Sequence, residues 1–235
     1  MKLEKVRIGY KESLLEIDQL TIVPGKVYAL IGANGRGKST LLQTLIGKLP
    51  VLSGDIFIER KNLSEIPVTD KSKLFGLVHS KFSGIPYMRA NEFVALGRTP
   101  YTNAFGRLTK KDLQIVEESM ETLGITHLAN RFTTELSDGE RQMFAIARIL
   151  AQETNYIFLD EPTAFLDYSN KKRVLEKLSE IAKSLNKSIV YSSHDLELAL
   201  EFSDELVCIP HQGNKVTNFL NEEMGVKKVI TICFE

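Results

Sequence analysis

The chain has 235 residues, 43% of them hydrophobic and 26% charged, which is typical of a globular protein with a substantial core. Its 30 Lys and Arg residues balance 30 Asp and Glu residues, which argues against a large basic surface for nucleic acid or anionic lipid. No stretch approaches the roughly 18 apolar residues of a membrane span, and the first residues lack a signal-peptide pattern. With two cysteines, Cys208 and Cys233, we expect a cytosolic protein with free thiols, whose membrane role would come through a partner.

Short apolar runs alternate with helical patterns, which favours an α/β fold with a largely parallel sheet. We expect strands at residues 2–8, 14–22, 26–31, 55–59, 75–79, 155–159, 188–192 and 205–209. We expect helices to begin at Lys38, near Arg89, and at Lys110, Asp138, Asn170 and Asp195.

The middle of the chain differs from its flanks. Residues 82–151 show helical patterns and loops without a convincing strand, and the apolar residues of 110–124 repeat at helical spacing, as in a packed helix. This predicts a helical subdomain inserted into the sheet domain. The tail, residues 211–235, carries no clear pattern.

Residues 32–40 read GANGRGKST, which satisfies the phosphate-loop pattern G-x-x-x-x-G-K-[ST] between an apolar strand and a helix. Glycines let the backbone curl so that its N–H groups converge on phosphate oxygens, and the helix N-terminus adds its positive dipole end. Lys38 would reach the β- and γ-phosphates, Ser39 would ligate Mg²⁺, and Thr40 would bond on the α-phosphate side. The residues that we expect to contact ATP here are Asn34, Gly35, Gly37, Lys38, Ser39 and Thr40.

A second apolar run, YIFLDE at residues 156–161, ends in two carboxylates. Ligands of a parallel sheet bind at the carboxyl ends of its strands, so Asp160 would lie near Mg²⁺. Glu161 would then polarise the attacking water as general base. Taken alone, the hexamer could equally be a strand that ends in an exposed acidic turn.

The pentapeptide LSDGE at residues 136–140 opens a helix, and by itself it indicates only a helix start with Ser137 as N-cap. The phosphate loop, LSDGE, the acidic strand end, EPTAFLD at 161–167 and SSHD at 192–195 follow one another in the order found in ATP-binding cassette (ABC) ATPases. The chain resembles that family up to about residue 209. The resemblance implies one nucleotide-binding domain, 1–235, with a RecA-like P-loop NTPase fold, an antiparallel N-terminal β subdomain, an ATP-binding core (1–82 and 151–235) and a helical signature subdomain (83–150).

In that family two copies enclose two ATP molecules head to tail, and the resemblance implies roles for matching residues. Ser137 and Gly139 of one copy would cap the γ-phosphate held by the other, and Asp167 would lie on the loop that crosses the interface. His194 would contact the γ-phosphate and orient the water, so that the implied catalytic residues are Lys38, Glu161 and His194. Tyr10 would stack on adenine, although a core or rim position is equally typical of a lone aromatic residue. His79, His127 and His211 lack metal-ligand spacing, so we expect no metal beyond the Mg²⁺ held by Ser39 and Asp160.

Two positions depart from the family pattern. Ser80 stands where the strand LFGLVHS usually ends in a Gln that touches Mg²⁺ and the water, and its shorter hydroxyl would act through a water or not at all. Asp138 stands where the signature usually has Gly. Because a carboxylate is favourable in the first turn of a helix, we expect Asp138 to face away from the nucleotide.

Residues 90–141, with ALGRTPY, FGRLTKKD and LGI–HLANR, resemble ABC subunits that import ferric siderophores, haem or cobalamin. The resemblance implies polytopic permease partners, which residues 83–99 would contact, and indirectly a substrate-binding protein. It places the chain on the inner face of the cell membrane and favours an iron complex over cobalamin, with no nucleic acid as partner. The alternatives are another ABC transporter, for export or lipoprotein release, and a soluble ABC ATPase of iron–sulfur assembly or translation.

Overall fold

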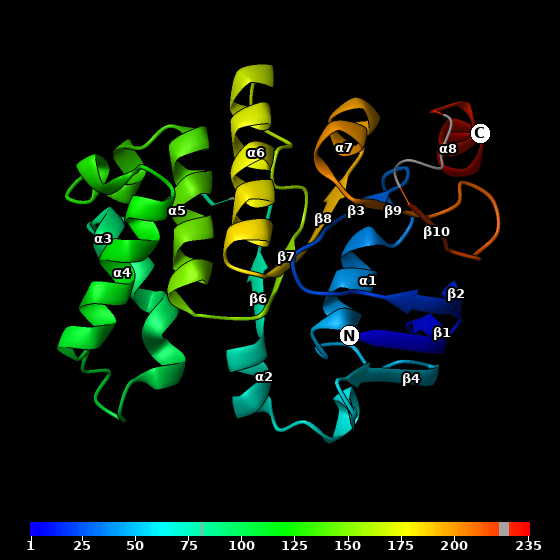
Figure 1. Ribbon diagram of the computed structural model, residues 1–235, viewed down its shortest axis with the longest axis horizontal. Coiled ribbons are helices and arrows are strands. Elements are labelled where there is room, and N and C mark those ends of the chain that lie inside the picture. The colour runs from blue at the N-terminus through cyan, green and yellow to red at the C-terminus, as the bar shows by residue number, and fades with distance from the viewer. Residues whose placement is uncertain (81, 221–225) are drawn as a thin grey trace.

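The computed structural model describes residues 1–80, 82–220 and 226–235, and it contains two β-sheets with helices around them (Figure 1). The larger sheet has the strand order β10-β9-β3-β8-β7-β6, in which every neighbouring pair is parallel except β10 with β9. Its strands are β3 (Val27–Ile31), β6 (Phe75–Val78), β7 (Tyr156–Leu159), β8 (Ser188–Ser193), β9 (Glu205–Cys208) and β10 (Thr217–Leu220).

The smaller sheet is antiparallel, with the strand order β2-β1-β4-β5. Its strands are β1 (Lys2–Gly9), β2 (Ser13–Thr21), β4 (Ser53–Ile58) and β5 (Lys61–Asn62). Alternation of buried and exposed residues along β1 shows why this sheet forms, because one face packs inward and the other meets solvent. The expected antiparallel N-terminal β region is therefore present.

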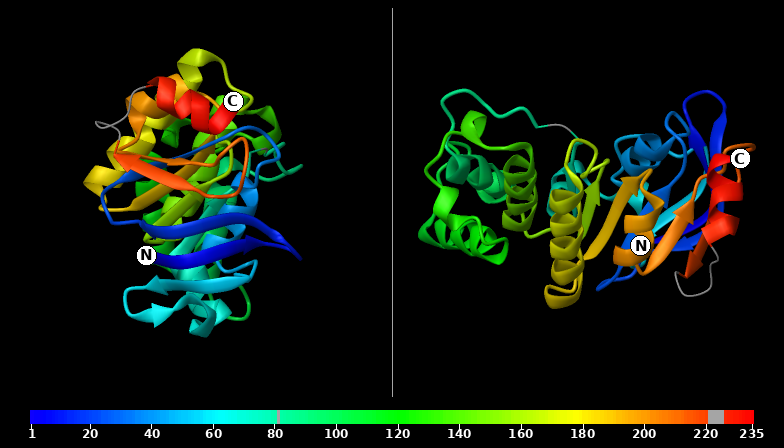
Figure 2. Two further views of the ribbon diagram at one scale, coloured as in Figure 1. Left: turned by 90° about the vertical axis from the view of Figure 1, so that its right-hand side faces the viewer. Right: turned by 90° about the horizontal axis from the view of Figure 1, so that it is seen from above.

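Strand β3 separates two hydrophobic cores. Its five residues are all buried, which is typical of a central parallel strand. Val27, Ala29 and Ile31 join the core formed with the helices of one face, whereas Tyr28 and Leu30 join the core shared with α1 (Lys38–Leu45) and the smaller sheet. Figure 2 shows the same arrangement from above, with α6 (Tyr168–Ser184) and α7 (Leu196–Phe202) on one face of the larger sheet and α1 on the other.

The region between β6 and β7 forms a helical block at one end of the molecule (Figure 1). It consists of α3 (Ala90–Ala95), the short helix η2 (Leu96–Tyr101), α4 (Lys110–Thr122), η3 (Thr126–Leu128), η4 (Thr133–Glu135) and α5 (Asp138–Ala151). As predicted, the described residues of this region form no β-strand. One isolated bridge pairs Arg89 with Phe132. Helix α5 carries ten buried residues and is the element through which the block packs on the sheet.

Several elements differ from the sequence-based expectation. Helix α6 begins at Tyr168 rather than Asn170, because Asp167 caps it through the N–H of Asn170, and α7 begins at Leu196 because Asp195 is its N-cap. No sequence pattern indicates β5, β10, η1 (Leu63–Glu65), α2 (Val68–Leu74) or α8 (Val226–Phe234). The tail therefore contains structure that its short, weak patterns did not indicate.

Helix α8, which contains Cys233, lies against β9 of the larger sheet, which contains Cys208. Both cysteines are free and fully buried, as expected. The Cys233 thiol lies 3.6 Å from the carbonyl oxygen of Ile31 at the end of β3. Contact with Cys233 and burial raise the pKa of Cys208. Both thiols therefore serve as small apolar groups that hold the tail to β3 and β9.

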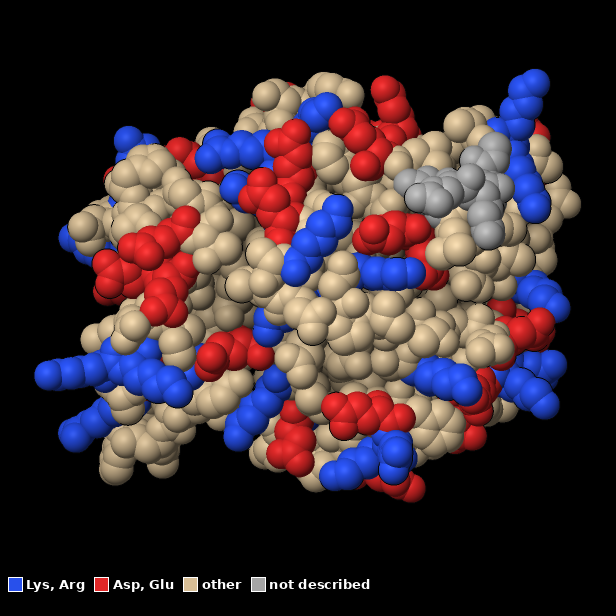
Figure 3. Space-filling view, in the orientation of Figure 1, with Lys and Arg blue, Asp and Glu red and all other residues tan. Residues whose placement is uncertain are grey.

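Opposite charges are interspersed on the face shown in Figure 3, as the equal numbers of acidic and basic residues suggest. Among the described residues, no helix combines the length and apolar composition that a bilayer crossing requires.

A buried ion pair fixes the helical block internally. The Nε atom of Arg98 donates to Asp112 at 2.9 Å, and both side chains are almost completely buried. Thr109 also donates to Asp112 through its backbone and its hydroxyl, at 2.8 Å and 2.6 Å, and forms a capping box at the start of α4. These hydrogen bonds from Thr109, followed by that from Arg98, lower the pKa of Asp112 to about 2.

Replacing Asp112 with Asn should lower the free energy of unfolding at pH 7 by about 2 kcal/mol, because a charge-assisted hydrogen bond to Arg98 is lost in a buried place. The contribution of the carboxylate is present above its ordinary pKa of 3.8 and is lost as the pH falls towards about 2. Denaturant titrations at pH 7 and at lower pH should therefore show the difference between wild type and Asp112→Asn shrinking with acid. Glu153→Gln, at the exposed second partner of Arg98, is the control and should cost less. Equal stability of Asp112→Asn and wild type at pH 7 would contradict this account.

Candidate nucleotide-binding site

The phosphate loop leads from the end of β3 into α1, as the sequence predicts. Gly37 is the N-cap residue with φ at 99°, and a Cβ atom there would lie 2.7 Å from the Leu14 side chain, so glycine is required both by conformation and by space. Within the described residues, the backbone N–H groups of residues 37–40 donate to no acceptor of the chain. A run of unpaired N–H groups at a helix N-terminus fits an anionic ligand such as phosphate.

Lys38 folds back over this loop and is 5% exposed. Its Nζ atom donates to the carbonyl oxygens of Gly32 at 2.8 Å and Ala33 at 3.2 Å, and to Oδ1 of Asn34 at 3.3 Å. The same atom lies 3.4 Å from Oε1 of Glu161. The ammonium group is thus held by neutral oxygens and one carboxylate at the mouth of the loop, where it can interact with phosphate oxygens.

Asp160 and Glu161 follow β7 directly, and Ser192 on β8 orients both. The Ser192 hydroxyl donates to Oδ1 of Asp160 at 2.8 Å and accepts from the Glu161 N–H at 2.8 Å. Glu161 has φ at 46°, in the left-handed region that non-glycine residues adopt rarely and often at functional sites. This turn directs the Glu161 carboxylate towards Lys38 rather than along the strand.

His194 follows β8, and its Nδ1 atom lies 3.9 Å from Oε2 of Glu161. The imidazole is half exposed, so a ligand can reach it. Strands β3, β8 and β7 are neighbours in the larger sheet and run parallel, so their carboxyl ends bring Lys38, His194 and Glu161 together. The three residues predicted to be catalytic therefore lie within one cluster of contacts.

The oxygen ligands available at this edge fit a hard divalent cation. The Ser39 hydroxyl stands exposed at the start of α1, and the Asp160 carboxylate is held at the end of β7 by Ser192. Hydroxyl and carboxylate oxygens are the ligands that Mg²⁺ prefers, usually together with substrate phosphates and water. Among the described residues, no group of three or more His, Cys, Asp or Glu side chains is arranged to hold a metal by itself.

The signature residues lie elsewhere in the chain, at the start of α5. Ser137 caps the helix, and its hydroxyl donates to Glu140 at 2.9 Å, while its N–H donates to the same carboxylate at 2.8 Å. The bond from the Ser137 N–H is the main reason that the pKa of Glu140 is lowered. No described contact joins Ser137 or Gly139 to Lys38, so one chain does not unite the two predicted halves of the site.

Gly139 allows the first turn of α5 to approach α6. A Cβ atom at Gly139 would lie 3.1 Å from the amide group of Asn170, which is tighter than ordinary contact. Asn170 in turn donates to both carboxylate oxygens of Asp167, through its N–H and its side chain, each at 2.8 Å. These bonds lower the pKa of Asp167 and connect the residue predicted at the interface to the signature helix.

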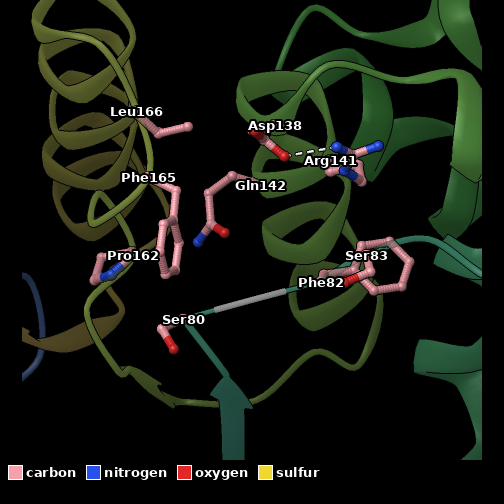
Figure 4. A pocket seen from close by; sticks show the side chains of 9 residues that line it. All are labelled: Ser80, Phe82, Ser83, Asp138, Arg141, Gln142, Pro162, Phe165 and Leu166. Atoms are coloured by element: carbon pink, nitrogen blue, oxygen red, sulfur yellow. Dashed lines mark hydrogen bonds and ion pairs between the residues drawn. The ribbon is translucent and has the colours of Figure 1, made fainter.

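The two departures from the family pattern line one cavity of about 270 Å³ between β6, α5 and the segment after Glu161 (Figure 4). Ser80 follows β6 by two residues. Asp138 forms an ion pair with Arg141 at 2.6 Å, one turn along the same helix. The cavity is lined by Ser80, Phe82, Ser83, Asp138, Arg141, Gln142, Pro162, Phe165 and Leu166.

Tyr10 stands in the turn between β1 and β2 and is 70% exposed. It is therefore not a core residue, and its ring is free to stack on a ligand. Leu14, near the start of β2, lies against Gly37, so this sheet edge adjoins the phosphate loop.

Sequence reasoning did not single out Ser192 and Asn170. Ser192 belongs to the motif SSHD, but only its position beside β7 shows that it holds Asp160 and Glu161. Asn170 carried no signal beyond its ordinary preference for helix starts.

Comparison with known proteins accords with this geometry. The ABC transporter family matches residues 15–164. An uncharacterised ABC transporter ATP-binding protein of Methanocaldococcus jannaschii is 36% identical over 98% of this chain and 79% of its own length. The ferric enterobactin transport ATP-binding protein FepC of Escherichia coli is 34% identical over 97% of this chain and 84% of its own length. Among solved structures, an inward-facing ABC transporter classed provisionally as metal-chelate type superimposes with a TM-score of 0.85 at 27% identity, over 98% of this chain and 87% of that one. The chain belongs to the ABC transporter family, and it is an ATPase of that family.

Proposed function

We propose that this chain is the ATP-hydrolysing subunit of an importer that carries an iron complex, a siderophore or haem, through a separate membrane permease. The observation that carries the ATPase part is the cluster of Lys38, Glu161 and His194 beside a loop of unpaired N–H groups. The iron cargo is supported by the relative that is named for ferric enterobactin transport and by the resemblance over residues 90–141. Cobalamin is the other cargo that this resemblance allows.

In the proposed mechanism the N–H groups of residues 34–40 and the Lys38 ammonium bind the phosphates of ATP. Glu161 accepts a proton from the attacking water, and His194, 3.9 Å from Glu161, orients that water and contacts the γ-phosphate. Ser39 and Asp160 would hold Mg²⁺, which neutralises charge on the β- and γ-phosphates when it is bound. Thr40 bonds on the α-phosphate side, and Tyr10 stacks on the adenine ring.

We propose that two copies assemble head to tail around two ATP molecules. The separation of Ser137 and Gly139 from Lys38 within one chain supports this, because a second copy would bring an α5 N-terminus to the γ-phosphate. Asp167 would lie at the contact between copies. The division into an ATP-binding core (1–82 and 151–235) and a helical signature subdomain (83–150) belongs to the same proposal.

The permease contact is assigned to residues 83–99, on the inner face of the membrane. Tyr87 is 92% exposed and Leu96 is 44% exposed, so this segment offers apolar side chains to a partner. A substrate-binding protein would deliver the cargo on the other side, without contact to this chain. An exporter or lipoprotein-release cassette, or an iron–sulfur assembly ATPase, would share the ATPase site but not the importer-type segment at 90–141.

Glu161→Gln should keep ATP binding and lower kcat by about 10²–10⁴-fold, because the amide cannot take the proton of the water. The variant should accumulate as an ATP-bound dimer in size-exclusion chromatography. Lys38→Ala is the matched comparison, since it should lose ATP binding itself in fluorescence titration with a labelled nucleotide. Normal turnover by Glu161→Gln would exclude Glu161 as the general base.

Asp138→Gly should leave kcat within about twofold of wild type, because the ion pair with Arg141 holds the carboxylate along its own helix. Steady-state ATP hydrolysis at saturating ATP measures this. A large gain in rate would mean that the Asp138 charge does approach the γ-phosphate of the partner copy.

Affinity capture of the chain from membranes should recover a polytopic permease, and transport assays should show uptake of a ferric siderophore or haem. Tyr87→Asp should weaken this recovery, because a charge enters the apolar contact. Phe105→Asp is the control, since Phe105 is 85% exposed in the same block but lies outside residues 83–99. Recovery of scaffold proteins of iron–sulfur assembly instead of a permease would contradict the importer.

A further inference from the structure

Gln142 is buried without a use in the fold. It lies in the second turn of α5 and is 5% exposed, yet within the described residues its carboxamide makes no hydrogen bond, and its Nε2 atom is shielded from solvent. Buried amides in folded proteins are nearly always hydrogen-bonded, because an unpaired one loses its bonds to water without replacement. The position therefore calls for a partner, either a water in the adjoining cavity or a group that another state of the protein brings to it.

The carboxamide faces the cavity of about 270 Å³ described above. In Figure 4 its polar end points into the space between Ser80 and Phe165, and the walls come from three separate parts of the chain. Ser80 lies after β6, Pro162 follows Glu161 directly, and Gln142 lies on the helix that begins at the signature. A cavity of this size can hold ordered water molecules. It can also close if its walls move together.

Few groups on these walls can pair with Gln142. Phe82, Phe165, Leu166 and Pro162 present apolar side chains, and the Asp138 carboxylate is already bonded to Arg141. Among the described lining side chains, the Arg141 Nε atom and the Ser80 and Ser83 hydroxyls remain. Arg141 can only donate, so the Nε2 atom of Gln142, itself a donor, is left with the two hydroxyls, each of which can both donate and accept. Ser80 is the one that closely follows β6, which runs beside β7, and the last residue of β6, Val78, accepts a hydrogen bond from the Asp160 N–H.

We propose that Gln142 is a positioning residue for ATP hydrolysis: when ATP is bound, its carboxamide hydrogen-bonds across the cavity to the Ser80 hydroxyl, directly or through one water. This inference rests on the proposed function and extends it. It assigns a contact between the signature helix, α5, and the edge of the larger sheet that carries Glu161. Ser80 and Gln142 line the cavity from different parts of the chain, the segment after β6 and helix α5. The Gln142–Ser80 pair holds the end of β6 in place beside Glu161. Neither polar atom of the Gln142 carboxamide touches the reacting groups.

The first test replaces Gln142 with Leu, which keeps the size of the side chain and removes its hydrogen bonds. We expect kcat to fall about tenfold or more while the KM for ATP changes by less than about twofold, because only the positioning of the catalytic edge is lost. Gln152→Leu is the matched control at the other end of α5. The Gln152 amide donates to the carbonyl oxygens of Ser72 and Phe75, so its loss should lower Tm and leave kcat unchanged.

The second test asks whether Ser80 is the partner. Ser80→Ala should slow hydrolysis, and the double variant Ser80→Ala, Gln142→Leu should be no slower than the slower single variant. Ser80→Gln in the Gln142→Leu background should recover much of the rate, because the carboxamide then comes from the other wall. Additive losses, or an unaffected Ser80→Ala, would overturn the pairing.

An unchanged kcat for Gln142→Leu, or a lower kcat accompanied only by unfolding at the assay temperature, would overturn the positioning role. All rates are measured on the purified chain, without permease or cargo. The protein concentration is high enough that the rate per chain no longer rises with concentration. Failure of iron transport would therefore count against the proposed importer and not against Gln142.

Discussion

The parallel register of β3, β8 and β7 is the constraint on which the site depends. These strands lie side by side at the middle of the larger sheet, so the segments that follow them must start from one edge. The phosphate loop, the SSHD segment and the pair Asp160–Glu161 are far apart in sequence and adjacent there for this reason. All three strands are fully buried, with alternate side chains in the two hydrophobic cores, so a register shift would exchange these side chains between the cores and disrupt the packing of both.

Opposite charges lie close together at this edge of the larger sheet. The Lys38 ammonium lies 3.4 Å from Glu161 and is bonded to loop carbonyl oxygens, whereas the loop N–H groups remain without acceptors. An anion at the loop would pair with these N–H groups and compete for Lys38, and in the proposed mechanism this would release Glu161 to accept a proton. The left-handed backbone at Glu161 and its bond to Ser192 keep the carboxylate at this place. Strain is thus located where the chemistry requires a fixed direction.

The signature end of the chain is organised by a different interaction, the contact of Gly139 with Asn170. Asp167 accepts hydrogen bonds from Asn170, so the segment proposed to lie at the contact between copies is connected to the start of α5. The cavity lined by Ser80 and Gln142 lies between α5 and the segments that follow β6 and Glu161. The proposed pairing of Gln142 with Ser80 would connect the signature helix to this edge of the sheet.

The sequence by itself determined the local features: the phosphate loop, the acidic strand end, the helix start at Ser137, and the succession of strands and helices that produces the larger sheet. Each depends on neighbours within about ten residues, through apolar periodicity, glycine conformation or capping. The starts of α6 and α7 were misplaced by one or two residues because the capping aspartates were counted as helical or overlooked. Only the tertiary structure decided the order of the strands, the bonds of Ser192 to Asp160 and Glu161, and the packing of α8 on β9. It also decided that Gln142 and Ser80 face one cavity. These features depend on contacts between residues tens to hundreds of positions apart, which no local pattern encodes.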